Sequence, residues 1–204
     1  MKRLGQYLFL CLVIFAFTGC SQGDYKWHTT NISGIMPDLA FSLIDQNGKT
    51  VTADTYYGQI NILFFGYTNC PDVCPLTLAQ LSSVLRQLPE AERKHFNVLF
   101  VSVDPARDKP AIRKAYTAAF GPEFYGLSGT LKELKKLNRR YRVTFGYGKK
   151  DAKDNYVVSH SAAMYIFDPK GRARLLAKGT ESSHELTEDF QQLLKISVNS
   201  TTMD

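Results

Sequence analysis

The chain has 204 residues, of which 44% are hydrophobic and 22% are charged. This suits one globular domain with a hydrophobic core and a further N-terminal segment. The formal net charge is +6, Lys and Arg are interspersed with Asp and Glu, and no basic stripe with interleaved aromatic residues is present. We therefore expect a solvated, mildly basic surface and exclude nucleic acid as a partner.

The N-terminus has the pattern of a targeting segment. Lys2 and Arg3 precede an apolar run over residues 7–17. That run is shorter than the roughly 20 residues of a transmembrane helix. Thr18-Gly19-Cys20 follows. This pattern resembles the bacterial lipoprotein signal, in which the cysteine is lipidated and becomes the first residue of the mature protein.

We expect the chain to have four segments: a signal peptide over residues 1–19, a tether over 20–33, a folded domain over 34–196 and a flexible tail over 197–204. Lipidation is expected at Cys20. The alternative for the N-terminus is an uncleaved membrane anchor. Both alternatives place the domain on the extracytoplasmic, periplasmic face of a membrane and hold it there.

The domain is predicted to begin with a β-hairpin, because Leu39, Phe41 and Leu43 alternate before an Asn-Gly turn at Asn47-Gly48. Strands are then predicted from apolar runs, and helices from apolar residues at helical spacing. The predicted strands are 60–65, 98–103, 124–127, 156–167 and 172–177, the last at a sheet edge. The predicted helices are 75–88, 110–120, 130–141 and 182–194.

Two of these helices begin with a capping pattern, formed by Thr130 with Glu133 and by Ser182 with Glu185. The helix over 110–120 is expected to be capped by Asp108. It is expected to face the core with four residues: Ile112, Ala115, Tyr116 and Ala119.

This order of elements predicts an α/β fold, in which a mixed central sheet carries an N-terminal β-hairpin and is flanked by helices on both faces. A reactive loop between the first central strand and its helix is the layout of a thioredoxin-like domain. In an open α/β sheet the functional crevice lies beyond the carboxyl ends of the strands. The loop that contains Cys70 and Cys74 is predicted to lie there.

Cys70 and Cys74 are the two cysteines expected in the folded domain, and each precedes a proline. Outside the cytoplasm a lone pair of cysteines forms a disulfide by default. Residues before proline avoid helical backbone angles, so we expect a loop here. The following helix N-terminus favours the Cys74 thiolate, whereas the carboxylate of Asp72 opposes it. The spacing alone leaves a disulfide, a redox dithiol and a metal site open.

A metal site would need a third ligand from across the crevice, and His160 is the best candidate because it precedes an apolar strand. Two thiolates and an imidazole suit copper, and the sulfurs favour Cu(I). A zinc site would need a fourth ligand, which the sequence does not offer convincingly. The alternative for His160 is a hydrogen-bonded loop histidine.

Three stretches in order resemble the Sco/SenC family of copper-binding assembly proteins. They are Tyr67-Thr68-Asn69-Cys70-Pro71-Asp72-Val73-Cys74-Pro75, then Val103-Asp104-Pro105 with Arg107-Asp108, then His160-Ser161 before a strand and an Asp-Pro-x-Gly turn. The resemblance implies a thioredoxin fold over residues 34–195. It also implies copper, as Cu(I) or Cu(II), bound once per domain by Cys70, Cys74 and His160.

The resemblance also implies a function: delivery of copper to the apo copper-centre subunit of cytochrome c oxidase, to mature its dinuclear copper centre. Catalytic turnover is not required, but a thiol reductant is, because a disulfide cannot bind the metal. Asp72, Asp104 and Asp108 are expected to tune the site or to face the partner, and the alternative for Asp104 and Asp108 is to serve only as turn and cap. Many members of the family have Asp before the histidine, where this chain has Ser159.

Two other functions stay open. One is a thiol–disulfide reductase that acts on the copper-ligand cysteines of the oxidase. It would need redox-active Cys70 and Cys74 but not His160. The other is a copper or redox sensor, which would use the same ligands with a different partner.

Overall fold

The computed structural model describes residues 25–152 and 155–201. The predicted signal peptide and the predicted lipidation site, Cys20, lie outside the described residues. Within the described ranges, every helix is too short or too polar to span a bilayer.

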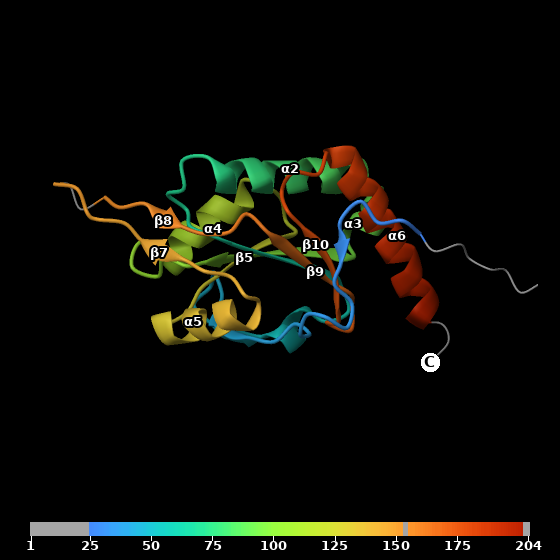
Figure 1. Cartoon of the computed structure of the whole chain (residues 1–204), viewed down its shortest axis with the longest axis horizontal. Coiled ribbons are helices and arrows are strands. Elements are labelled where there is room, and N and C mark those ends of the chain that lie inside the picture. Colours follow the sequence, from blue (N-terminus) through green and yellow to red (C-terminus); the bar gives the residue numbers. More distant parts are fainter. Residues whose placement is uncertain (1–24, 153–154, 202–204) are drawn as a thin grey trace, which may run out of the picture.

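A mixed six-stranded sheet lies at the centre of the molecule (Figure 1). Its strands are β1 (Thr30–Asn31), β4 (Ile60–Gly66), β5 (Phe96–Ser102), β6 (Phe124–Leu127), β9 (Met164–Phe167) and β10 (Ala173–Ala177). Their order across the sheet is β1-β10-β9-β4-β5-β6. β4, β5 and β6 are parallel, whereas β9, β10 and β1 each pair antiparallel with their neighbours.

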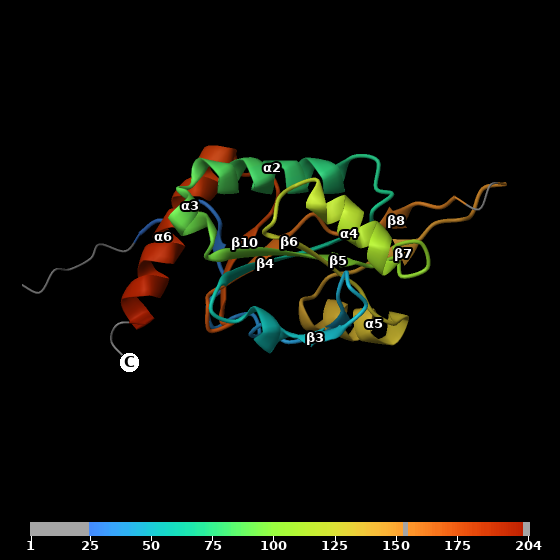
Figure 2. The same ribbon diagram turned by 180° about the vertical axis from the view of Figure 1, so that it is seen from behind.

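Helices cover both faces of this sheet (Figures 1 and 2). One face has α2 (Val73–Gln87), α3 (Glu90–Arg93), α4 (Pro110–Ala118) and α6 (Ser183–Thr201). The other has α5 (Leu131–Arg140), the hairpin of β2 (Ser42–Ile44) and β3 (Thr50–Thr52), and the 3-10 turn η2 (Ala53–Tyr56). A small ribbon of β7 (Gly146–Tyr147) and β8 (Val158–Ser159) projects from the end of the molecule at which α2 begins.

β4 joins the two layers because all seven of its residues are buried. Ile62 and Phe64 pack with α2 and α6 in one hydrophobic cluster, and Leu63 and Phe65 pack with α5 and the hairpin in the other. Successive side chains of a strand point to opposite faces, so an uninterrupted apolar run serves both layers. The predicted α/β fold, its hairpin and both capping patterns are confirmed.

Predictions near the two chain ends are wrong in part. β1 lies inside the predicted tether of residues 20–33 and pairs with β10, which is therefore an inner strand and not an edge. This pairing satisfies backbone groups that an open edge would expose. At the other end α6 continues to Thr201, through most of the predicted flexible tail, and Ser197 is buried against the domain.

Of the four residues predicted to face the core from helix α4 and its C-cap, Tyr116 packs against it, whereas Ala115 and Ala119 are exposed. Arg113 and Thr117 are buried, whereas Ile112 is 48% exposed. The Arg113 guanidinium donates to four backbone carbonyls of the surrounding chain. A buried charge is tolerated when its donors are satisfied in this way. The predicted cap is also wrong, because Lys109 is the N-cap residue and Asp108 has other partners.

Candidate metal centre

The cysteine loop connects the carboxyl end of β4 to the start of α2. Cys70 lies in a turn in which its N–H donates to the Tyr67 carbonyl over 3.2 Å. Cys74 is the second residue of α2, so the loop ends at Asp72 and the prediction that Cys74 lies in it is wrong. Pro75 is then the third helical residue. Its missing N–H costs nothing there, because the first four N–H groups of a helix have no partner within the helix.

Gly66, the last residue of β4, lets α2 approach the sheet closely. A Cβ atom at this position would lie 2.6 Å from Cys74 Sγ and 2.7 Å from a ring carbon of Phe100. Neither distance is compatible with a real side-chain contact. The sequence therefore places the buried sulfur directly against the strand backbone.

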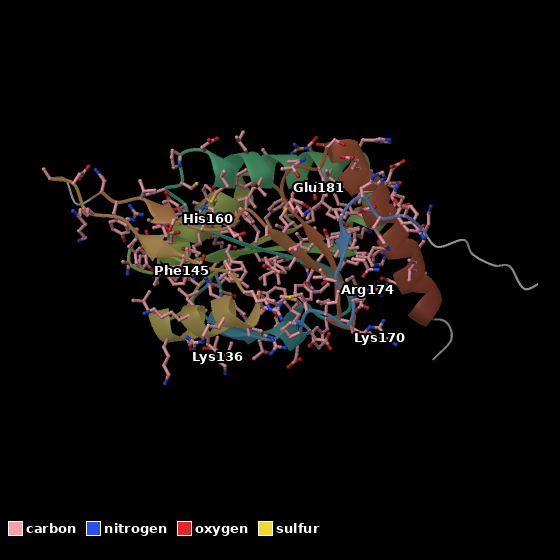
Figure 3. All side chains as sticks on the ribbon, in the orientation of Figure 1. Lys136, Phe145, His160, Lys170, Arg174 and Glu181 are labelled. Carbon is pink, nitrogen blue, oxygen red and sulfur yellow. The ribbon has the colours of Figure 1, made fainter. Side chains whose placement is uncertain are left out.

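His160 reaches the two sulfurs from the segment between β8 and β9 (Figure 3). Its Nε2 lies 3.2 Å from Cys74 Sγ and 3.7 Å from Cys70 Sγ. Its Nδ1 lies 3.0 Å from the Ser161 carbonyl oxygen, which can only accept a hydrogen bond. Nδ1 therefore bears the proton, and the Nε2 lone pair faces the sulfurs, as a metal ligand requires.

The ligand atoms of Cys70, Cys74 and His160 all lie within 4.8 Å of one another. Bonds of about 2.3 Å to sulfur and about 2.0 Å to nitrogen allow sulfur and nitrogen ligands of one ion to be up to about 4.3 Å apart. Both observed nitrogen–sulfur distances are shorter than this limit, so the three side chains fit one shared ion. No fourth His, Cys, Asp or Glu joins this group among the described residues, which argues against tetrahedral zinc.

Both cysteines are free thiols, Cys74 fully buried and Cys70 half-buried. Burial raises the pKa of the Cys74 thiol far above its ordinary value, the Tyr67 backbone hydrogen bond opposes the shift, and the neighbouring Cys70 adds to it. Burial therefore opposes the thiolate that the helix N-terminus is expected to favour. A soft metal must displace the proton when it binds.

Two aromatic rings hold the imidazole of His160 edge-on. The centroid of the Tyr67 ring lies 5.7 Å from that of His160, and the centroid of the Phe64 ring lies 6.2 Å from it. Sequence reasoning gave neither residue a role. The available signal was their position, since Phe64 lies in the buried strand and Tyr67 opens the cysteine stretch.

Asp108 is fully buried and fixes the start of the cysteine loop. Its two carboxylate oxygens accept hydrogen bonds from the Thr68 N–H (2.8 Å) and the Thr68 hydroxyl (2.6 Å). The hydroxyl of Ser102, the last residue of β5, donates to the same carboxylate. Asp108 thus ties the cysteine loop to the neighbouring strand and does not face a partner.

Asp104 is also fully buried, and it positions the segment that leads to His160. Its carboxylate accepts hydrogen bonds from the Arg107 guanidinium and from the Tyr156 hydroxyl. Arg107 in turn donates to the Tyr156 carbonyl and lies 3.7 Å from the centroid of the Tyr156 ring. Since Tyr156 precedes β8, the Asp104–Arg107 pair fixes the approach of the histidine segment to the cysteine loop.

The other two polar residues of interest lie outside the ligand cluster. Asp72 is exposed at the N-cap of α2 and makes no capping hydrogen bond, so a partner-facing role for it stays a prediction. Ser159 donates to the Gly146 carbonyl and does not contact His160. The Ser161 carbonyl takes the orienting role that a carboxylate before the histidine could have had.

An open mixed sheet with a cysteine loop at the carboxyl end of its first central strand defines a thioredoxin-like domain, and this one has a sulfur–imidazole metal centre. The SCO1/SenC family model matches residues 35–195, well over half of the chain. The chain therefore belongs to the SCO1/SenC family, as its sequence motifs predict.

Relatives and solved structures agree with this assignment. The mitochondrial SCO2 homolog of Bos taurus is 37% identical over 164 residues, which cover 76% of this chain and 61% of the bovine protein. The chain thus spans less than two thirds of the length of that relative.

At least three solved relatives contain copper. ScoI of Bradyrhizobium japonicum with copper bound has 38% identity and a TM-score of 0.68, with 76% of this chain and 98% of that chain covered. ScoI of Arabidopsis thaliana with copper bound has 32% identity and a TM-score of 0.72, with 78% and 98% covered. The predicted thioredoxin-like fold is confirmed, and the predicted metal is the one bound in these relatives.

Proposed function

We propose that the chain is a membrane-tethered, extracytoplasmic protein that binds one copper ion and matures the dinuclear copper centre of cytochrome c oxidase. The convergence of Cys70, Cys74 and His160 carries this proposal. The copper in two solved relatives supports the metal. The oxidase role and its partner, the apo copper-centre subunit, rest on the family resemblance, and the tether rests on the N-terminal sequence pattern.

The three ligands differ in their access to solvent, and this difference suits transfer. Cys74, in the first turn of α2, is fully buried, whereas Cys70 and His160 are half-buried. Three protein ligands leave a copper ion open to a further ligand from a receiving protein. Ligands can then be exchanged one at a time, with Cys74 the last to release the ion because it lies deepest. Loading displaces the thiol protons and requires a reductant that keeps both sulfurs free.

The test is a Cu(I) titration of the reduced chain, with and without His160→Ala. We expect one ion per wild-type chain and an affinity at least about tenfold lower in the variant, because a ligand is lost. His95→Ala is the matched control, because His95 is exposed just before β5 and is not one of the three ligands. This variant should bind copper like wild type. Unchanged affinity and stoichiometry in His160→Ala would show that the three-ligand site is wrong.

A thiol–disulfide reductase is the second candidate, and one contact favours it. The Cys74 N–H donates to Cys70 Sγ over 3.5 Å, which orients the sulfur of the more exposed cysteine at the start of α2. Cys70 would attack a partner disulfide and Cys74 would resolve the mixed disulfide. The partner then gains two electrons and two protons, and a Cys70–Cys74 disulfide forms.

The two candidates differ in their need for His160. A reductase should reduce a model disulfide at the wild-type rate after His160→Ala, whereas the copper site should be weakened. If the wild-type chain binds no copper and still reduces disulfides, the reductase replaces the copper protein as the proposed function.

A further inference from the structure

Most of the net positive charge of the chain arises in one short segment, α5 and the two residues that follow it. Residues 131–142 include six Lys or Arg and one Glu, a net charge of +5 in a chain whose total is +6. Lys2 and Arg3 provide two more charges, so the remaining residues sum to −1. The expectation of interspersed charges is therefore wrong here. We call the six exposed cations the basic face: Lys132, Lys135, Lys136, Arg139, Arg140 and Arg142.

The basic face has no partner that accounts for it within the domain. Arg140 donates to the Asp38 carbonyl, but the other five cations make no hydrogen bond or ion pair with the described residues. Glu133, the one acid of the segment, is engaged with both the N–H and the hydroxyl of Thr130. The positive charge of residues 131–142 is therefore exposed to solvent and available to an external partner.

The basic face has a fixed orientation and lines a hollow. Leu134 and Leu137 bury the opposite side of α5 in the core, so the helix is fixed with its cations outward. Lys132, Lys136 and Arg140 are four residues apart and follow one side of the helix. They line a hollow of about 630 Å³, large enough for phosphate groups, whose other lining residues are 40–43, Thr130, Glu133 and Leu137.

The composition of the basic face suits a lipid surface better than a protein. Stable protein interfaces depend on aromatic or buried Arg anchors and are depleted in Lys. This surface is half Lys, and its one exposed large apolar residue is Leu131, 45% exposed at the helix start. Anionic headgroups attract each surface cation by about 1 kcal/mol without requiring a complementary shape. A basic cluster and an N-terminal anchor together form the two signals that hold a protein stably on a membrane.

We propose that the basic face docks on the anionic phospholipid headgroups of the membrane that tethers the chain. This rests on the membrane placement proposed above. α5 and the site lie in different parts of the molecule, since Lys136 and His160 lie on opposite sides of the sheet in Figure 3. Docking therefore leaves the cysteine loop and His160 uncovered at the end of the domain, pointing along the membrane and not into it.

Lysine acetylation of the full chain tests whether the basic face docks on anionic headgroups. The chain is reconstituted into vesicles of phosphatidylcholine, alone or mixed with phosphatidylglycerol, and mass spectrometry measures acetylation at each lysine. Acetylation of Lys132, Lys135 and Lys136 should slow about threefold or more in the anionic vesicles, and high salt should reverse this because exposed charges are screened. Lys178, exposed away from the basic face, should be labelled equally in both.

A pair of charge reversals provides the matched comparison. Arg139→Glu with Arg142→Glu removes two members of the basic face and keeps its three lysines as reporters, so their protection should fall. Arg86→Glu with Lys195→Glu makes the same change in net charge at exposed sites on α2 and α6 and should keep the protection. Wild-type copper stoichiometry and wild-type labelling in neutral vesicles show that each variant is folded.

Equal labelling of the three lysines in both vesicles overturns the proposal. So does protection that appears with inorganic phosphate in neutral vesicles, which would indicate an ion site, or only with an acidic protein, which would indicate a protein partner. Sedimentation with neutral vesicles is scored separately. Its failure would contradict the tether, while the comparison of neutral with anionic vesicles would still decide whether the basic face binds lipid.

Discussion

The hydrogen atom that serves as the side chain of Gly66 sets the distance between the Cys74 sulfur and β4. Gly66→Ala would force a methyl group against Cys74 Sγ and the Phe100 ring, both of which are fully buried. Overpacking of this kind costs about 1–3 kcal/mol. We expect a lower free energy of unfolding in urea and a weaker copper affinity, because the displaced sulfur is a ligand.

Gly126→Ala separates these two effects. A Cβ at Gly126 in β6 would lie 2.7 Å from the Arg113 Cβ, so the core is overpacked to a similar degree away from the sulfurs. This variant should lose stability and keep the copper affinity. Equal losses of affinity in both variants would mean that Gly66 acts through general stability and not through Cys74.

Single residues also show how far sequence reasoning can go. Cys70, Cys74 and His160 could be predicted as ligands because the family motif places them in order, although the cysteine spacing alone leaves a disulfide and a redox dithiol open. The role of Asp108 could not be predicted, because its partners, Thr68 and Ser102, come from two other segments. Only the packed structure shows that a residue resembling a helix cap holds the cysteine loop.

At the scale of elements, α5 begins with a complete capping box. Thr130 Oγ1 accepts from the Glu133 N–H, and the Glu133 carboxylate accepts from the Thr130 N–H over 2.7 Å. These hydrogen bonds hold the pKa of Glu133 below its ordinary value. The stabilisation is therefore present above a pH of about 4.5, the unfolded value, and is lost as the pH falls through the folded value.

We expect Glu133→Gln to lower the free energy of unfolding by about 0.5 kcal/mol at neutral pH, a small value because the cap is partly exposed to solvent. At a pH well below the folded pKa the variant and wild type should be equally stable, since the wild-type carboxylate is then protonated. Urea unfolding at both pH values measures this. Glu90→Gln, an exposed change on α3, is the control. A constant difference at both pH values would contradict the assignment.

Most elements follow from local pattern, and the exceptions have a common cause. Buried strands such as β4 are apolar without interruption, and caps such as Thr130 have local partners, so both could be predicted. The inward side of α4 could not, because Arg113 replaces apolar burial with hydrogen bonds to carbonyls distant in sequence. The sequence predicts β10 at the edge of the sheet. In the structure Thr30 and Asn31, two residues of the predicted tether, pair with β10 and form the edge in its place.

At the scale of the whole molecule, one buried carboxylate fastens the first described residues to α6. Asp189 is fully buried and accepts hydrogen bonds from the Tyr25 hydroxyl, the His28 N–H, and the N–H and hydroxyl of Thr29. Asp189→Ala leaves these donors without their acceptor. Such a loss costs about 1–3 kcal/mol for each buried group that finds no water.

In Asp189→Ala we expect faster hydrogen exchange at Thr29 and in β1, with copper affinity unchanged because the ligands lie at the other end of the domain. Glu188→Gln, which changes a neighbouring carboxylate that contacts His28, is the control. It should affect exchange much less, because Glu188 is partly exposed. Unchanged exchange in Asp189→Ala would show that β1 is held by its pairing with β10 alone.

The attachment at Asp189 has a mechanical consequence. The chain enters the domain beside α6, whereas the cysteine loop and His160 lie near the opposite end, where α2 begins (Figures 1 and 3). In the proposed function, copper would thus be held at the end of the domain away from the proposed tether. Shortening the tether should reduce the distance from the membrane anchor at which copper can be handed over, although no ligand is changed.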